Sequence, residues 1–222
     1  MTNYKIFYFN ALRTACTVLW GEDRRCAIAD PGCWTEKERV ELTDFIASEG
    51  LTPSVILLTH GHPDHICAAG SLQAKYGIPV RISPAEKPFL EQFRGMGVNI
   101  GIRDLDTGFH TEDAAEGTDI PVGKDLTLKV ISTPGHSAGG VCYYDPAGEI
   151  LLAGDTLFAG SIGRTDLPGG DYDQLIASIL EKLMPLPGGT LVIAGHGGTT
   201  TIGREAATNP FLEPFNEPME DF

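Results

Sequence analysis

A short segment of the chain gathers residue types that bind metal ions. The run HGHPDH places His60, His62, Asp64 and His65 within six residues. Three histidines and an aspartate at this spacing have no packing rationale. Imidazole nitrogens and carboxylate oxygens are, however, ligands of zinc, and also of iron and manganese. The segment therefore predicts a metal site.

Further candidate ligands follow other apolar runs of the sequence. The runs VILLT, VIST, ILLAG and LVIAG lead into polar residues of this kind, which are His60, His62, Asp64, His65, His136, Asp155 and His196. Side chains at strand ends, and in the loops after them, converge at one edge of an α/β sheet system. Any one of these histidines taken alone, such as His196, is more often a hydrogen-bonded core residue than a ligand.

Seven such groups exceed the four ligands of a tetrahedral zinc. They suit two ions that share a bridging carboxylate and a bridging water and lie roughly 3.5–4 Å apart. Zinc, iron and manganese all accept this ligand set. The expected cofactors are therefore two divalent metal ions, with zinc as the first choice and iron or manganese as alternatives.

Strands and helices alternate in the sequence between these motifs. Apolar runs predict strands, and these are KIFYF, ACTVLW, CAIADPG, VILLT, PVRIS, LTLKVIST, VCYYD, EILLAGD and TLVIAG. Thr35 and Glu38 form a capping-box pattern before a helix that Gly50 ends. Further helices are predicted over ICAAGSLQAKYG and DYDQLIASILEKLM. Residues 84–121 show little regular pattern beyond a helical PFLEQF, and long irregular stretches are often functional lids.

The recurring order of strand, polar tip and helix predicts an α/β fold with two sheets between helices. The chain has 222 residues, of which 42% are hydrophobic. That is enough to bury a core without disulfides. We expect one compact domain over residues 1–222.

The composition excludes several classes of function. A net charge of −14 argues against a nucleic-acid partner and an RNA-processing nuclease, because phosphate binding needs a basic face. No apolar run approaches the roughly 18 residues of a membrane span, and the alternating N-terminus is typical of a strand rather than a signal peptide. The five scattered cysteines form no CxxC pair, which favours reduced thiols in a cytoplasmic protein. Cys67 is interpreted as a small buried filler at the start of a helix.

Four motifs resemble those of the metallo-β-lactamase superfamily. They are HGHPDH at 60–65, TPGHS at 133–137, GDT at 154–156 and GH at 195–196, in the family's order, and the resemblance spans about residue 5 to about residue 210. It implies an αββα sandwich, in which helices flank two mixed β-sheets. It also implies that His60, His62 and His136 hold one ion, that Asp64, His65 and His196 hold the other, and that Asp155 bridges them. Asp30 matches a family aspartate that supports the metal loop, or is a turn-starting residue before Pro-Gly.

Within the superfamily the chain is most similar to the glyoxalase II group, the hydroxyacylglutathione hydrolases and their short bacterial relatives. Residues 157–179 and GREAATNP at 203–210 carry this resemblance. The short forms match best, since glutathione-specific members continue into a larger C-terminal helical region and only 26 residues follow His196 here. The implied activity is thioester hydrolysis by an activated water. Asp64, which could also steer the proton, and Asp155 are the candidate catalytic residues.

Alternative functions stay open at this point. A persulfide dioxygenase would hold a single iron through the residues that match His60, His62 and either Asp155 or His136. A lactonase or a β-lactamase could use the same fold. A non-catalytic metal-binding module would usually have lost ligands, whereas the full set is present here.

The expected partner is a small-molecule substrate, a thioester of a 2-hydroxy acid. Neither nucleic acid nor a membrane is expected as a partner, and the oligomeric state, including a homodimer, is left open. Arg164 in GRTD orients the substrate, locks the site loop or forms a structural salt bridge. His110 is interpreted as a solvated loop residue. Tyr143 and Tyr144 are adjacent on a predicted strand, so at most one of them points at the site.

Overall fold

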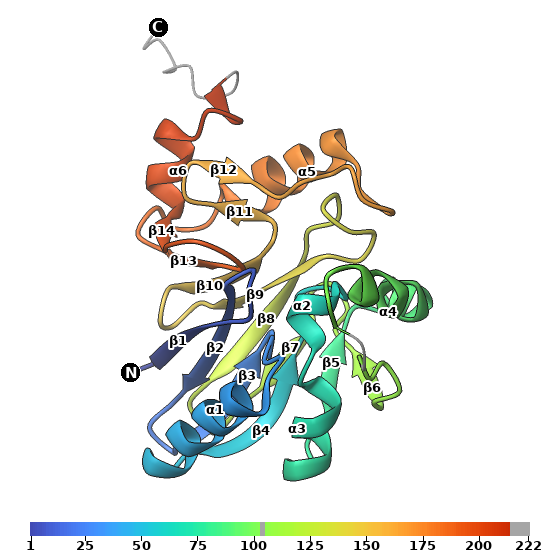
Figure 1. The fold of residues 1–222 in the computed structure, drawn as a ribbon. Helices are drawn as coiled ribbons and strands as arrows, with labels where there is room; N and C mark the ends of the chain where they lie inside the picture. The colour runs from blue at the N-terminus through green and yellow to red at the C-terminus, as the bar shows by residue number, and fades with distance from the viewer. Residues whose placement is uncertain (103–104, 214–222) are drawn as a thin grey trace, which may run out of the picture.

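Two six-stranded sheets pack face to face, with helices on their outer sides (Figure 1), in the computed structural model, which describes residues 1–102 and 105–213. The first sheet has the order β1 (Asn3–Phe9), β2 (Thr14–Trp20), β3 (Arg25–Ala29), β4 (Thr52–Leu57), β5 (Val80–Ile82), β6 (Thr111–Asp113). The second has the order β14 (Thr200–Thr201), β13 (Leu191–Ala194), β10 (Ile150–Gly154), β9 (Val141–Asp145), β8 (Thr127–Ser132), β7 (Asp119–Pro121). This architecture confirms the predicted αββα sandwich.

Both sheets are mixed. In the first, β1, β2 and β3 are antiparallel, and β3 to β6 run parallel. In the second, β7 to β10 are antiparallel, β10 and β13 are parallel, and β14 returns antiparallel to β13. The carboxyl ends of parallel strands lie at one edge of a sheet, so the loops that follow β3, β4, β10 and β13 are brought to the edges where ligands commonly bind.

Helices flank the outer face of each sheet. Beside the first sheet lie α1 (Glu36–Ser48), α2 (Pro63–Ile66), α3 (Ala69–Tyr76), the 3₁₀ turn η1 (Lys87–Phe89) and α4 (Leu90–Asn99). Beside the second lie α5 (Tyr172–Ser178), the π-helical turn η2 (Ile179–Leu183) and α6 (Ile202–Thr208). The predicted capping box of α1 is confirmed, because Thr35 caps the helix and Glu38 bonds back to the backbone of Thr35. Among the described residues, no helix combines the length and apolar character needed to span a bilayer.

Three apolar clusters fill the spaces between these layers. The inter-sheet cluster joins Val55 and Leu57 of the first sheet to Val130 and Leu152 of the second. A second cluster lies under α1, α3 and α4, and a third lies under α5 and α6. Strand β4 contributes alternate residues to two of the clusters, which explains why VILLT reads as a continuous apolar run.

The segment 84–121 is more regular than its sequence predicts. The prediction of a loop over the glycine-rich residues after Phe93 is wrong, because α4 continues through them to Asn99. A Cβ on Gly97 would lie 3.4 Å from the Cβ of Pro63, at ordinary van der Waals distance, so this part of α4 packs against α2. Further along, β6 pairs with β5 and β7 pairs with β8, so the chain crosses from one sheet to the other within this segment.

Candidate metal centre

The structure brings all seven candidate ligands to one place between the two sheets. The first sheet supplies four of them through the loop after β4 and through α2, and the second sheet supplies three through the loops after β8, β10 and β13. Their ligand atoms form three overlapping groups, each within 4.8 Å, which are His60–His62–His136, His60–His65–Asp155 and Asp64–His65–His196. The arrangement predicted from strand ends is therefore present.

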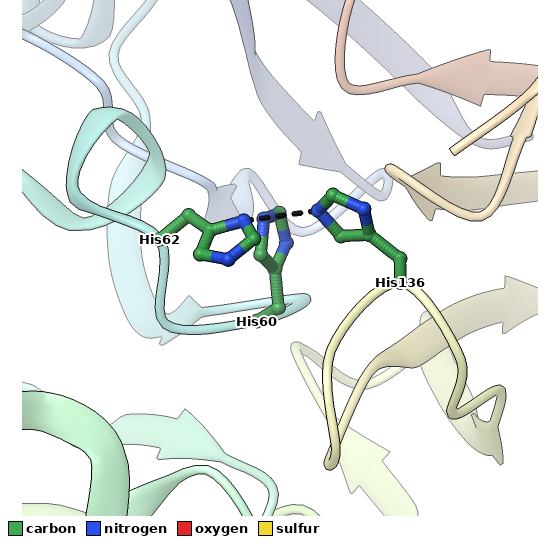
Figure 2. Close-up of side chains that lie close together, drawn as sticks. All are labelled: His60, His62 and His136. Atoms are coloured by element: carbon green, nitrogen blue, oxygen red, sulfur yellow. Dashed lines mark hydrogen bonds between the residues drawn. The ribbon is translucent and has the colours of Figure 1, made fainter. Parts of the chain in front are cut away.

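The first-site histidines are His60, His62 and His136. Figure 2 shows the rings of His62 and His136 pointing toward one another, with His60 beside them. Nδ1 of His62 and Nε2 of His136 are 2.9 Å apart, and the ring centroid of His60 lies 4.6 Å from that of His62. All three are buried, and the ring of Phe93 from α4 packs edge-on against His62 at 5.2 Å.

The second-site residues are Asp64, His65 and His196. Nε2 of His65 and Nε2 of His196 are 3.4 Å apart. Oδ2 of Asp64 lies 3.4 Å from each of these nitrogens. Three ligand-type atoms thus face a common point, at the spacing that an ion between them would require.

Asp155 lies between the two groups. Its Oδ1 is 3.5 Å from Nε2 of His65, and its Oδ2 is 3.5 Å from Nε2 of both His136 and His196. One carboxylate therefore faces histidines of both groups. This is the geometry expected of a bridging ligand.

Hydrogen bonds on the far side of three rings fix which nitrogen carries the proton. Nδ1–H of His136 donates to the carbonyl of Arg164 at 2.7 Å, and Nδ1–H of His196 donates to the carbonyl of Leu12 at 3.0 Å. Nδ1 of His65 faces Oδ2 of Asp30 at 3.1 Å. A donor on Nδ1 leaves Nε2 as the nitrogen that can bind a metal, and such outer partners orient metal-binding histidines.

Asp30 and Thr59 supply the same kind of support to His60. Oδ1 of Asp30 accepts the backbone N–H of Thr59 at 2.8 Å, and Oδ2 accepts the Thr59 hydroxyl at 2.7 Å. Since that hydroxyl hydrogen is used, the 3.0 Å contact to His60 has Nδ1–H of His60 as the donor, and Nε2 of His60 keeps its lone pair. Asp30 thus supports residues of both groups rather than only starting a turn.

The electrostatics differ between the two groups of histidines. Burial, reinforced by the neighbouring histidines, lowers the pKa of His62 to about 3 and holds the pKa of His60 well below its usual value. Burial also lowers the pKa of His65 and His196, but nearby carboxylates outweigh it and raise these pKa values to about 9 and about 10. The pKa of Asp64 falls below its usual range, since His65 and His196 outweigh the effect of burial. In the absence of metal, His65 and His196 therefore carry protons at neutral pH, whereas His60 and His62 do not.

Three buried polar atoms at the centre have no hydrogen-bond partner among the described residues. They are Nε2 of His60, Nε2 of His62 and Oδ1 of Asp155. Unpaired buried polar groups are costly and rare in proteins. Divalent cations would satisfy Nε2 of His60 and Oδ1 of Asp155 directly, whereas His62 faces His136 through its Nδ1. Nitrogen and oxygen donors are the types that zinc, iron and manganese accept. The residues therefore fit a pair of metal ions.

A cavity of about 750 Å³ opens above the candidate ligands. Its floor includes His62, His136, Asp155 and His196. Its walls come from three regions of the chain and are largely apolar, and they include Leu12, Met96, Ile100, Phe158 and Ile162. The hairpin of β11 (Leu157–Phe158) and β12 (Ser161–Ile162) forms one wall and α4 forms another. A small molecule with an apolar part fits this volume and lining.

Arg164 stands at the edge of this cavity. Its side chain is exposed and pairs with Asp166 through two hydrogen bonds of 2.7 Å. Its main-chain carbonyl holds His136. The structure thus shows the salt bridge considered for this residue, together with a backbone contact to the centre that no sequence motif indicates.

Other residues singled out in the sequence lie away from the cavity lining. His110 is exposed, and its backbone pairs with the side chain of Gln73. Tyr143 and Tyr144 point to opposite faces of their sheet, and neither lines the cavity. Cys67 packs against the cluster under α3, where burial raises the pKa of its thiol. These positions agree with the interpretation of His110 as a solvated loop residue and of Cys67 as a small filler, although Cys67 is half-buried rather than buried.

Besides Thr59, sequence reasoning missed Thr14 and Glu86, two further buried polar residues that contact the site loops. Thr14 of β2 donates a hydrogen bond to Asp64. Glu86, just after β5, accepts hydrogen bonds from the backbone of Gly61 and Gly139. The position of Glu86 in the loop after a strand end is a signal that could have drawn attention to it. Thr14 lies within an apolar alternation that gives no such signal.

The fold and site define a class of protein. Residues 10–196 match the metallo-beta-lactamase superfamily, and the chain belongs to that superfamily. Its members bind divalent metal ions, and membership together with the seven-residue centre identifies a metal-dependent hydrolase.

Particular relatives cover nearly the whole chain. Hydroxyacylglutathione hydrolase GloC of Haemophilus influenzae is 35% identical over 213 residues, which cover 95% of this chain and 98% of the relative. The BLEG-1 B3 metallo-beta-lactamase has a TM-score of 0.86 at 38% identity, over 95% of this chain and 99% of that one. TTHA1623, solved in a di-iron-bound form, has a TM-score of 0.84 at 36% identity, over 94% and 100% of the two chains.

Proposed function

We propose that the chain is a binuclear metal-dependent thioester hydrolase of the cytoplasm, acting on small 2-hydroxyacyl thioesters. The observation that carries this proposal is the position of Asp155, whose two oxygens each lie 3.5 Å from a histidine of a different group. The similarity to a relative named hydroxyacylglutathione hydrolase supports the substrate class. A structure of TTHA1623 in a di-iron-bound form supports a pair of ions.

The chemistry divides between the ions and the protein. Two divalent ions held by the seven ligands would activate a water molecule and polarise the substrate carbonyl. Asp155 sets the spacing between the two groups of ligands. Asp64 stays ionised at neutral pH because its pKa is depressed, so its carboxylate would hold one ion together with His65 and His196 and could orient a nearby water as a hydrogen-bond acceptor. The apolar walls hold the acyl and thiol parts of the substrate above the floor of the cavity.

The lining of the cavity favours a substrate with a stable leaving group. Apart from the candidate ligands, the polar lining residues that the structure describes are Asn99, Ser161 and Arg164. None of them is a good general acid near neutral pH. A thiolate leaves as a stable anion and needs no proton, whereas an amide nitrogen does. This difference favours a thioester over an unactivated amide.

Hydrolysis of a β-lactam is the second candidate. It is supported by the similarity to the BLEG-1 B3 metallo-beta-lactamase at 38% identity. Ring strain activates a β-lactam amide, so the missing general acid weighs less against it than against an ordinary peptide. The same centre and the same cavity would serve this reaction.

A direct comparison of substrates tests the proposal. Purified metal-loaded protein is assayed with a 2-hydroxyacyl glutathione thioester, the corresponding oxygen ester and a chromogenic β-lactam. Thiol release with a kcat/KM of ~10⁴ M⁻¹s⁻¹ or more, in the range of ordinary enzymes, and at least ~100-fold above the other two substrates, supports a thioester hydrolase. A preference for the β-lactam by the same margin would replace the proposal with the second candidate.

A further inference from the structure

Glu86 is a buried carboxylate that lies between two of the metal-site loops. It follows β5 and begins the η1 turn that leads into α4. Its side chain is fully buried. Oε2 accepts the backbone N–H of Gly61 at 2.8 Å, and Oε1 accepts the backbone N–H of Gly139 at 2.7 Å.

These two backbone groups belong to the loops that carry the first-site histidines. Gly61 is the residue between His60 and His62, in the loop after β4 of the first sheet. Gly139 lies three residues after His136, in the loop between β8 and β9 of the second sheet. One side chain therefore ties the first-site ligands of one sheet to those of the other.

The two glycines make this close approach possible. A Cβ on Gly139 would lie 2.7 Å from the backbone nitrogen of Glu86, and a Cβ on Gly61 would lie 3.1 Å from Oε2 and 2.7 Å from the ring of Phe93. Real Cβ atoms do not tolerate contacts this short with backbone atoms. The loops are thus shaped around the carboxylate.

The chemistry of the contact requires a carboxylate. Both oxygens accept N–H donors, and only an ionised acid presents two acceptor oxygens at this spacing. A glutamine would direct its NH₂ group at one of the two backbone N–H groups. No cation lies within ion-pair distance of Glu86 among the described residues. A buried charge is costly. Among the described residues, the side chain of Glu86 hydrogen-bonds only to the backbone of the two loops, which it joins.

The second-site residues are supported by different contacts. Thr14 bonds to Asp64, Asp30 bonds to His65, and the carbonyl of Leu12 bonds to His196. Glu86 makes no hydrogen bond to these three ligands. A substitution of Glu86 should therefore change the metal affinity of the two sites unequally.

We propose that Glu86 is a positioning residue for the first metal site, setting the distance between the His60–His62 loop and the His136 loop. The proposal rests on the proposed binuclear centre. Loss of the carboxylate lowers the affinity for the ion held by His60, His62 and His136 and leaves the affinity for the other ion nearly unchanged. Changes to groups that orient metal ligands typically cost 10–100-fold in metal affinity, and we expect a loss of at least ~10-fold.

The test measures zinc affinity site by site in the full-length chain. Metal-free protein is titrated with Zn²⁺ against a competing chelator in two backgrounds. His196→Ala leaves the first site as the tighter one, and His136→Ala leaves the second. Glu86→Gln is added to each background, and the change in dissociation constant is compared between them.

Asp145→Asn is the matched control. Asp145 is also buried and also accepts two hydrogen bonds, from Thr2 and from the backbone of Ala147, but it lies at the turn between β9 and β10. The Asp145→Asn substitution should lower thermal stability without changing the zinc affinity of either site. Glu86→Asp, whose shorter side chain cannot reach both N–H groups, is measured in the same way in case the glutamine variant does not fold.

The outcomes separate the two proposals. A loss of at least ~10-fold in the His196→Ala background, with less than ~3-fold in the other, supports the role of Glu86. Equal losses in both backgrounds, or no loss in either, overturn it while the binuclear centre stands. Failure of the unmodified protein to bind two zinc ions overturns the centre and, with it, the role of Glu86.

Discussion

The hydroxyl of Thr14 donates a hydrogen bond of 2.7 Å to Oδ2 of Asp64, and both side chains are buried. Thr14 begins β2, whereas Asp64 lies in α2. The contact thus joins the N-terminal strands to the metal loop. The same oxygen of Asp64 faces His65 and His196, so the threonine helps to set the direction in which the carboxylate presents its remaining lone pairs.

Thr14→Val should weaken zinc binding by the second-site residues without changing zinc binding by the first-site histidines. Valine keeps the shape of the side chain but removes the donor to Asp64, and loss of such a partner typically costs 10–100-fold in metal affinity. Zinc titration of the variant should show one dissociation constant raised by ~10-fold or more. Thr190→Val is the control, because Thr190 is equally buried and its hydroxyl has no hydrogen-bond partner among the described residues. Equal zinc dissociation constants for the Thr14→Val and Thr190→Val variants would contradict the role of Thr14.

Asp155→Ala should abolish most of the activity. The carboxylate faces histidines of both groups, so its removal should release at least one ion and misplace the other. The contribution of a catalytic metal amounts to several kcal/mol, which corresponds to a loss of kcat/KM of ~10³-fold or more. The measurement is thioester hydrolysis at saturating zinc, with circular dichroism to confirm folding. A folded variant that keeps more than a tenth of the activity would contradict the bridging position.

Metal binding should release protons near neutral pH. The pKa values of His65 and His196 are raised to about 9 and about 10 in the metal-free chain. Both imidazoles are therefore protonated at pH 7.5, and an ion must displace a proton from each nitrogen that it binds. The affinity should rise with pH up to that range. Calorimetric titrations in two buffers of different ionisation enthalpy should give a release of about two protons per chain, and a release near zero would contradict these pKa directions.

Arg164→Gln should change substrate binding more than turnover. The main-chain carbonyl of Arg164, not its side chain, holds His136. We therefore expect kcat to stay within about twofold, while KM rises severalfold for thioesters that carry a carboxylate, which a guanidinium binds well. Kinetics with a charged and an uncharged thiol carrier check this. A large fall in kcat for both carriers would instead place the guanidinium in the reaction itself.

Local patterns in the sequence predict much of the fold and the candidate site. Strand ends and their polar tips place all seven candidate ligands, and the capping box of Thr35 and Glu38 marks the start of α1. These features depend on residues close together in the chain, or on the general convergence of strand ends. The αββα arrangement implied by the resemblance to the metallo-β-lactamase superfamily is confirmed.

The contacts that support the site could not be predicted in the same way. Thr14 acts on Asp64 across 50 residues, and Glu86 acts on Gly139 across 53. The second contact depends on how the two sheets pack, and the first depends on the order of strands within the first sheet. The length of α4 was missed because its glycines disfavour a helix locally, while packing against α2 stabilises it. The ligand roles, the single domain over residues 1–222 and the cytoplasmic location stay predictions.

Metal content per chain tests the central claim most directly. Protein produced in medium supplemented with zinc, iron and manganese is purified and analysed for all three metals, and oxygen uptake is measured with a persulfide substrate. We expect about two equivalents of metal per chain, as for a two-metal hydrolase, thioester hydrolysis that is lost on chelation, and no oxygen uptake. About one equivalent of iron, together with persulfide-dependent oxygen uptake, would contradict the binuclear hydrolase and identify a mononuclear iron dioxygenase instead.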